Sequence, residues 1–239
     1  MARRPARRSS RRASAQTSAV PAGEREKIIA AFLALLAEQP FDEIGLADIA
    51  GQAGVSLAQL RDEFPSVLAI LAAHMKAIDR TVLTGDFSDM QEESARERLF
   101  DVLMRRLEAL GPHRLAISSL IRSARRDPLL ALALNGLGVR SQQWMLTAAG
   151  INASGPRGMI RAQGLAALFA SVLRAWVHDE DPGLARTMAA LDRALARGQR
   201  FAGFLDDLCY IPSRLCRMRS RWRHRRRDRD EEEPESATA

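Results

Sequence analysis

The residue types that most often perform chemistry in proteins are sparse in this sequence. It contains four histidines and two cysteines among 239 residues. His178 precedes the acidic run Asp179–Asp181, which could offer metal ligands, but neighbouring residues at a helix end point in different directions. We therefore interpret this run as a helix cap. Cys209 and Cys216 could bind a metal or pair between chains, and the sequence favours free, reduced thiols in a cytoplasmic protein.

Motifs that mark catalytic or cofactor sites are missing from the sequence. It has no glycine-rich phosphate loop, no nucleophile elbow and no HExxH motif. We therefore predict that the protein is not an enzyme and carries neither a cofactor nor a metal.

Several bulky side chains in the second half of the sequence could line a pocket for an apolar molecule. Such pockets are mainly apolar and contain a few polar groups. The candidates are His113, Trp144, Met145, Phe169 and Trp176. Helical spacing does not distinguish a pocket lining from an ordinary core, so both interpretations stay open here.

The positive charge of the chain lies at its two ends. The formal net charge is +7, yet residues 1–23 alone hold six arginines and no acid, and residues 213–239 hold nine arginines and six acids. The remaining residues comprise 21 basic and 23 acidic side chains. We predict a disordered Arg-rich arm over 1–23 and a charged disordered tail over 213–239.

Composition and periodicity predict an all-helical protein. Aromatic residues make up only 5% of the chain, and no alternating β pattern occurs. The longest apolar run, Ile28–Ala37, is about half of the roughly 20 residues that a membrane-spanning helix needs. The lapse of apolar periodicity over 85–91 predicts a boundary between two helical domains, residues 24–84 and residues 92–205.

Turn and cap residues divide both predicted domains into helices. In the first domain, Gly54 permits a tight turn and Ser56 caps the helix that follows. Breaks such as Asp127-Pro128 and Asp181-Pro182, where Asp is expected to cap a helix and Pro to fill its first turn, separate the helices of the second domain. Its expected helices cover residues 93–110, 112–124, 127–149, 157–178 and 182–203.

The first domain carries residues that resemble the helix-turn-helix signature of the tetracycline-repressor (TetR) family. They are Ile49, Ala50, Ala53 to Ser56, Leu60, Phe64 to Ser66 and Leu71. The resemblance implies a cytoplasmic, dimeric transcriptional regulator that binds operator DNA and a small hydrophobic effector. It also implies that helices 157–178 and 182–203 form much of the homodimer interface.

In that family the helix after Ser56 enters the major groove of DNA. The resemblance therefore implies a DNA-contacting set in this chain, which comprises Ser56, Leu57, Gln59, Arg61, Arg25 and Lys27. Residues 24–85 hold five basic and nine acidic side chains, so neutralisation of DNA phosphates would depend on the Arg-rich arm.

The second domain has a resemblance of its own, to lipid-binding accessory proteins of ubiquinone biosynthesis. The residues that carry it are Asp101 to Leu110, Trp144, Arg161 to Leu165, Trp176, Asp179 to Pro182 and Thr187 to Arg193. Those proteins share the repressor scaffold without reading DNA. This resemblance implies an alternative function, a lipid- or quinone-binding accessory protein.

Overall fold

A computed structural model describes residues 23–85 and 92–199, and the regular elements of these two ranges are all helices, without a strand. The Arg-rich arm, Cys209, Cys216 and the charged tail lie outside the described residues. The all-helical prediction is confirmed for the part of the chain that the structure describes. No helix in these two ranges is long and apolar enough to cross a membrane.

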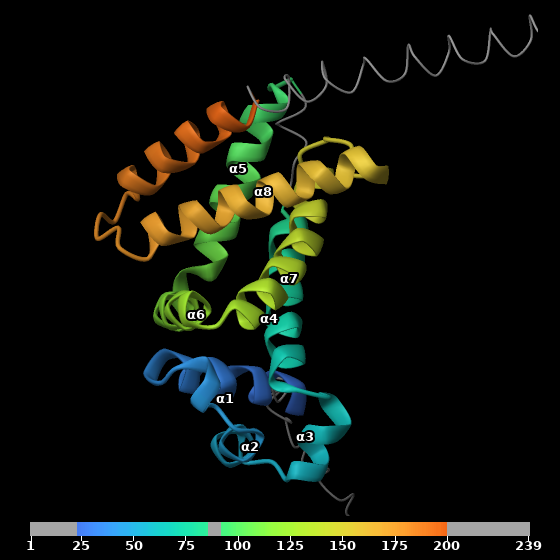
Figure 1. Ribbon diagram of the computed structural model, residues 1–239, viewed down its shortest axis with the longest axis vertical. Helices are drawn as coiled ribbons and strands as arrows, with labels where there is room; N and C mark the ends of the chain where they lie inside the picture. Colours follow the sequence, from blue (N-terminus) through green and yellow to red (C-terminus); the bar gives the residue numbers. More distant parts are fainter. Residues whose placement is uncertain (1–22, 86–91, 200–239) are drawn as a thin grey trace, which may run out of the picture.

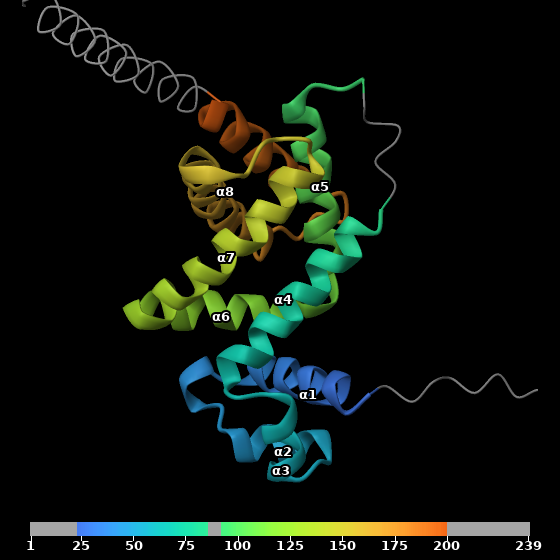
Figure 2. The same cartoon turned by 90° about the vertical axis from the view of Figure 1, so that its right-hand side faces the viewer.

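The N-terminal head contains four α-helices, and Figure 1 shows α1, α2 and α3 gathered at one end of the molecule. The elements are α1 (Glu24–Glu38), the short 3-10 turn η1 (Phe41–Glu43), α2 (Leu46–Ala53), α3 (Leu57–Glu63) and α4 (Val67–Leu83). The long helix α4 leads out of the head toward the rest of the chain (Figure 2). It is therefore the covalent link between the two ends of the molecule.

The remaining helices form a larger body. They are α5 (Ala95–Leu110), the turn η3 (Gly111–His113), α6 (Arg114–Arg126), α7 (Pro128–Ala148), α8 (Gly155–Trp176) and a helix over residues 185–199. α7 begins where Asp127 accepts hydrogen bonds from the backbone N–H groups of Leu129 and Leu130, at 2.8 and 3.1 Å. Pro128 fills its first turn, as the sequence predicts.

The last described helix begins later than the sequence predicts. Leu184 has a positive φ of 53°, a left-handed conformation that interrupts the expected helix from residue 182. Asp181 closes a turn by accepting from Gly183 and Ala185, at 3.0 and 3.1 Å. The helix therefore starts at residue 185, and residues 200–203 of the prediction lie outside the described ranges.

The head does not complete its own hydrophobic core. Phe32 and Leu36 of α1 are fully buried in a cluster that also contains Ala116 and Leu120 of α6. Two hydrogen bonds reinforce this contact: Ser119 Oγ donates to the carbonyl of Gln39 at 3.1 Å, and the N–H of Phe41 donates to Ser123 Oγ at 3.0 Å. The body helix α6 therefore forms part of the support of the head.

A buried ion pair joins α4 to the body. It lies among the apolar residues with which α4 and α5 pack together, such as Ile78 and Leu103. Arg106 of α5 donates to Asp79 Oδ1, and Ser141 Oγ of α7 donates to the same oxygen at 2.7 Å. Arg106 is 3% exposed and Asp79 is 7% exposed. Burial lowers the pKa of Arg106, and the neighbouring Asp79 carboxylate raises it. This network fixes α4 against α5 and α7.

Removal of the carboxylate from this pair should destabilise the protein strongly. Asp79→Asn would leave the Arg106 cation buried without compensation, and we expect a loss of about 3 kcal/mol in the free energy of unfolding, measured with urea. The double variant Asp79→Leu with Arg106→Met should recover much of that loss, because it removes both charges. The exposed Asp62→Asn, the matched control, should change stability by less than about 0.5 kcal/mol. Equal effects of Asp79→Asn and Asp62→Asn would contradict this role.

Candidate functional site

The helix α3 lies on the outside of the head with most of its side chains in solvent. Leu60 is its only buried residue, whereas Leu57 is 57% exposed and Gln59 and Arg61 are exposed. The turn before it contains Gly54 with a φ of +66°, a conformation that glycine adopts at low cost. α2, this turn and α3 therefore have the arrangement of a helix-turn-helix, with α3 as the presented helix.

Ser56 and Gln59 form a reciprocal cap at the start of α3. Ser56 Oγ accepts from the N–H of Gln59 at 3.2 Å, and Gln59 Oε1 accepts from the N–H of Ser56 at 2.8 Å. Gln59 Nε2 also donates to Glu24 Oε1 at 2.7 Å. Because the amide is engaged at both ends, contact with a DNA base requires Gln59 to leave this arrangement.

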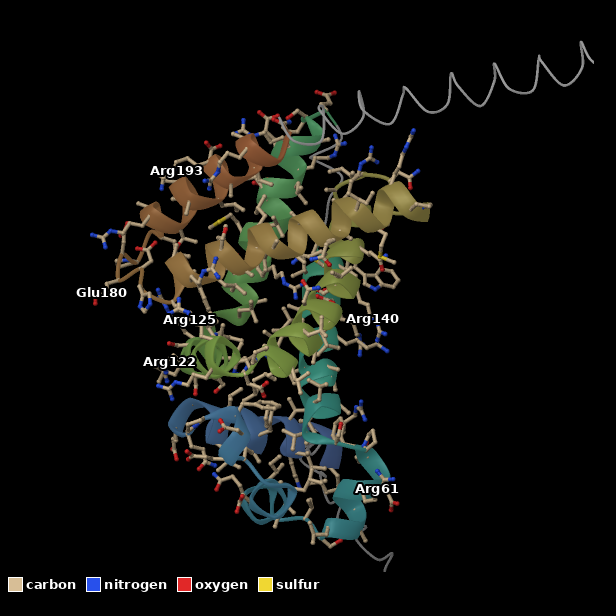
Figure 3. All side chains as sticks on the ribbon, in the orientation of Figure 1. Arg61, Arg122, Arg125, Arg140, Glu180 and Arg193 are labelled. Carbon is tan, nitrogen blue, oxygen red and sulfur yellow. The ribbon has the colours of Figure 1, made fainter. Side chains whose placement is uncertain are left out.

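The basic side chains of the head differ in the contacts that they make with the rest of the protein. Arg25 pairs with Glu63 at 3.1 Å and stacks over the ring of Phe64, 4.4 Å from its centroid, so it fastens α1 to the end of α3. Arg61 donates to the carbonyl of Pro65 at 3.2 Å and lies on the outer side of the head in Figure 3. Lys27 is exposed on α1. The predicted DNA contacts thus share the α1 and α3 end of the molecule, and their role in DNA binding stays a prediction.

Charge is divided unequally between the two parts that the structure describes. Residues 24–85 hold five basic and nine acidic side chains, and residues 92–199 hold 15 basic and ten acidic ones. The head is therefore acidic and the body basic. Duplex DNA attracts a basic surface, so the head alone is electrostatically unsuited to non-specific phosphate binding.

Two solved structures share this arrangement of helices. A TetR transcriptional regulator from Rhodococcus sp. RHA1 aligns with a TM-score of 0.54 and 23% identity, over 73% of this chain and 95% of that chain. A second, from Nitrosomonas europaea ATCC 19718, aligns with a TM-score of 0.56 and 21% identity, over 73% and 97%. The chain has the TetR-like fold. No family model matches its sequence, and no curated protein matches it either.

The body of this TetR-like fold contains a cavity of about 800 Å³. Its walls come from the start of α5, the end of α7, α8 and the helix over 185–199, which Figure 1 shows beside one another at the end away from the head. Leu99, Leu165 and Leu195 are nearly fully buried and contribute to an apolar lining. The volume and lining are typical of a small-molecule site.

None of the five residues proposed from the sequence as ligand contacts lines this cavity. Met145, Phe169 and Trp176 are buried in the core of the body, and Trp144 is 58% exposed on α7. Phe169 lies under Arg106, and Trp176 lies under the guanidinium of Arg114, 5.2 Å from the ring centroid. Ligand binding by these residues stays a prediction, and the cavity is a separate candidate.

A pair of histidines lies between the head and the body of the TetR-like fold. His113 of η3 packs edge-on against His74 of α4, with 4.8 Å between ring centroids. Burial, together with His113 and Arg106, lowers the pKa of His74 to about 4. His74 Nε2 has no hydrogen-bond partner among the described residues. The neutral form of His74 is therefore the form that fits the fold.

The interpretation of the acidic run as a cap agrees with the hydrogen bonds of Asp179. Its carboxylate accepts from the N–H of Thr187 at 2.8 Å and from the hydroxyl of Thr187 at 2.7 Å. The hydroxyl hydrogen bond lowers the pKa of Asp179. Asp179 thus satisfies a backbone donor in the first turn of the helix over 185–199.

Sequence reasoning missed the cavity because its apolar residues have the spacing of any core. One signal was available: Arg157 and Arg161 lie four residues apart at the start of a mainly apolar helix, and both line the cavity. It also missed Asp79, Arg106 and His74, which occur within apolar helical stripes. A polar residue in such a stripe is the pattern that indicates a buried polar contact.

The histidine pair predicts a loss of stability in mild acid. The folded pKa of His74 is about 4 and its unfolded value is about 6.5, so the unfolded chain binds this proton first as pH falls. The contribution of His74 to the free energy of unfolding is therefore fully present above pH 6.5 and is lost as the pH falls toward 4. Between pH 7 and pH 5 the loss should be about 2 kcal/mol. His74→Phe, which keeps a ring, should reduce the pH dependence of urea unfolding by that amount. An unchanged pH dependence would contradict the assignment.

Proposed function

We propose that the protein is a cytoplasmic, non-enzymatic, DNA-binding transcriptional regulator of the TetR type, controlled by a small hydrophobic effector. The observation that carries the proposal is the exposed face of α3, which follows the glycine turn with only Leu60 buried. An unburied helix at the extremity of a head is suited to the major groove. The TetR-like fold supports the same function.

The net charge of the head is negative, so DNA binding requires basic residues from outside the head. Residues 1–22, which directly precede the head in the sequence, contain six arginines. In the proposed complex they contact phosphates or a minor groove beside the site of α3. Arg61 and Lys27 add the contacts of the head itself, with Gln59 available to adenine once it leaves Glu24.

The proposal includes a homodimer through α8 and the helix over 185–199. Both helices carry apolar side chains in solvent: Met159 is 52% exposed and Met188 is 38% exposed. Exposed apolar residues extend onto α7, where Leu132 is 69% exposed. Such apolar surface favours association of two copies, which would place two α3 helices on one operator.

A second candidate function is a lipid- or quinone-binding accessory protein that does not read DNA. Two observations favour it: the acidic head and the apolar cavity of about 800 Å³. On this alternative the protein retains an apolar molecule and ignores duplex DNA at physiological salt.

DNA selection with the full chain separates the two functions. From a pool of random duplexes in about 150 mM salt, the regulator should enrich one operator sequence, and its affinity should fall steeply as salt rises. Arg61→Ala should then weaken binding to that operator about tenfold or more. The control Arg125→Ala, at an exposed arginine of α6 that Figure 3 shows away from Arg61, should leave affinity unchanged. No enriched sequence, or full binding by Arg61→Ala, would overturn the proposed role of α3.

A further inference from the structure

The cavity in the body has a buried apolar interior and a side that is open to solvent. Leu146 and Leu165 are 3% and 5% exposed, whereas Ile160 is 53% exposed. An elongated apolar group would therefore be covered at one end and reach solvent at the other. A ligand with two chemically different ends fits this gradient better than a uniformly apolar one.

Charge at the cavity is of one sign. Arg96, Arg157, Arg161 and Arg197 contribute to its lining, and within the described residues no acidic side chain does so. Arg96 pairs with Asp192, and Arg161 donates to the carbonyl of Asn152 at 3.2 Å. Guanidinium groups bind carboxylates and phosphates through paired, charge-assisted hydrogen bonds.

Two of these arginines have their charge uncompensated in the part of the chain that the structure describes. Arg157, at the start of α8, and Arg197, near the last described residue, are exposed and form no ion pair with a described residue. They come from two different walls of the cavity. An anion at the opening would therefore meet positive charge on both walls.

We propose that the cavity binds a single-chain amphiphilic anion, with its hydrocarbon chain against the leucines and its carboxylate or phosphate at Arg157 and Arg197. This inference deepens the proposed function, since it rests on the hydrophobic effector postulated there and names its chemical class. It distinguishes an anionic lipid from a neutral one such as a quinone. The affinity comes from burial of methylene groups, about fourfold for each, and from the charged head group.

Direct binding measurements test the ligand class without DNA. Purified full-length protein is titrated calorimetrically with dodecanoate, dodecyl phosphate and dodecanol, all below their aggregation limits. Both anions, or one of them, should bind at least tenfold more tightly than the alcohol. A preference between the two anions then identifies a fatty acid or a phosphate-headed lipid as the source.

A glycine in the cavity wall offers a variant that fills the site. A Cβ at Gly164 would meet no atom within 4 Å, and leucine favours a helix more than glycine does. Gly164→Leu should therefore fold and weaken dodecanoate binding at least tenfold. Gly136→Leu on α7 is the matched control, because Gly136 is equally open and lies outside the cavity. It should bind as the parent protein does.

Replacement of the two arginines tests the head-group contact. Arg157→Gln with Arg197→Gln should lower the affinity for the preferred anion at least tenfold and leave dodecanol binding unchanged. Equal binding of anion and alcohol, no binding of either anion, or full binding by Gly164→Leu would each overturn the inference. Anion binding without any operator would refute only the DNA-binding proposal, and operator binding without anion binding would refute only this one.

Discussion

The burial of one charged pair, Asp79 with Arg106, constrains the position of the head on the body. Removing both charges from water is costly, and the cost is met only while each partner keeps the other and its hydrogen bonds. Ser141 adds a donor from α7 to the same carboxylate oxygen. A shift of α4 against α5 or α7 therefore has to keep these contacts or replace them, and the head moves as α4 moves.

The same network lies between the cavity and the presented helix. Arg106 is on α5, two turns beyond Leu99 of the cavity wall, and its guanidinium lies 5.4 Å from the ring centroid of Phe169 on α8. Both α5 and α8 thus connect the cavity to the contact that fixes α4. In the proposed regulator, an effector acts by favouring one arrangement of these helices, and only to the extent that it binds the two arrangements with different affinities.

Much of the fold could be predicted because local chemistry determines it. Gly54 located the turn before α3, and the hydroxyl of Ser56 and the carboxylate of Asp127 cap α3 and α7 as expected. The start at residue 182 was wrong, because the left-handed Leu184 depends on tertiary packing and gives no signal in composition.

The candidate site was less predictable, because contacts between distant residues define it. The exposure of α3 follows from its sequence, but the engagement of Gln59 by Glu24 joins residues 35 positions apart. Likewise, apolar spacing describes Leu165 in a cavity wall and Phe169 in the core equally well. An apolar residue lines a cavity only where neighbouring helices from different parts of the chain leave a gap, and the sequence does not show where such gaps occur.

The central claim is that head and body form one cooperative unit. They are joined by the packing of α6 against α1 and by the buried ion pair between Asp79 of α4 and Arg106 of α5. Native-state hydrogen exchange tests it most directly, by comparing the free energies of opening at Phe32 in α1 and Leu103 in α5. The account predicts that the two values agree within about 1 kcal/mol and match the free energy of global unfolding. Exchange at Phe32 through a much less costly opening, with Leu103 still protected, would show that the head unfolds independently and would contradict the account.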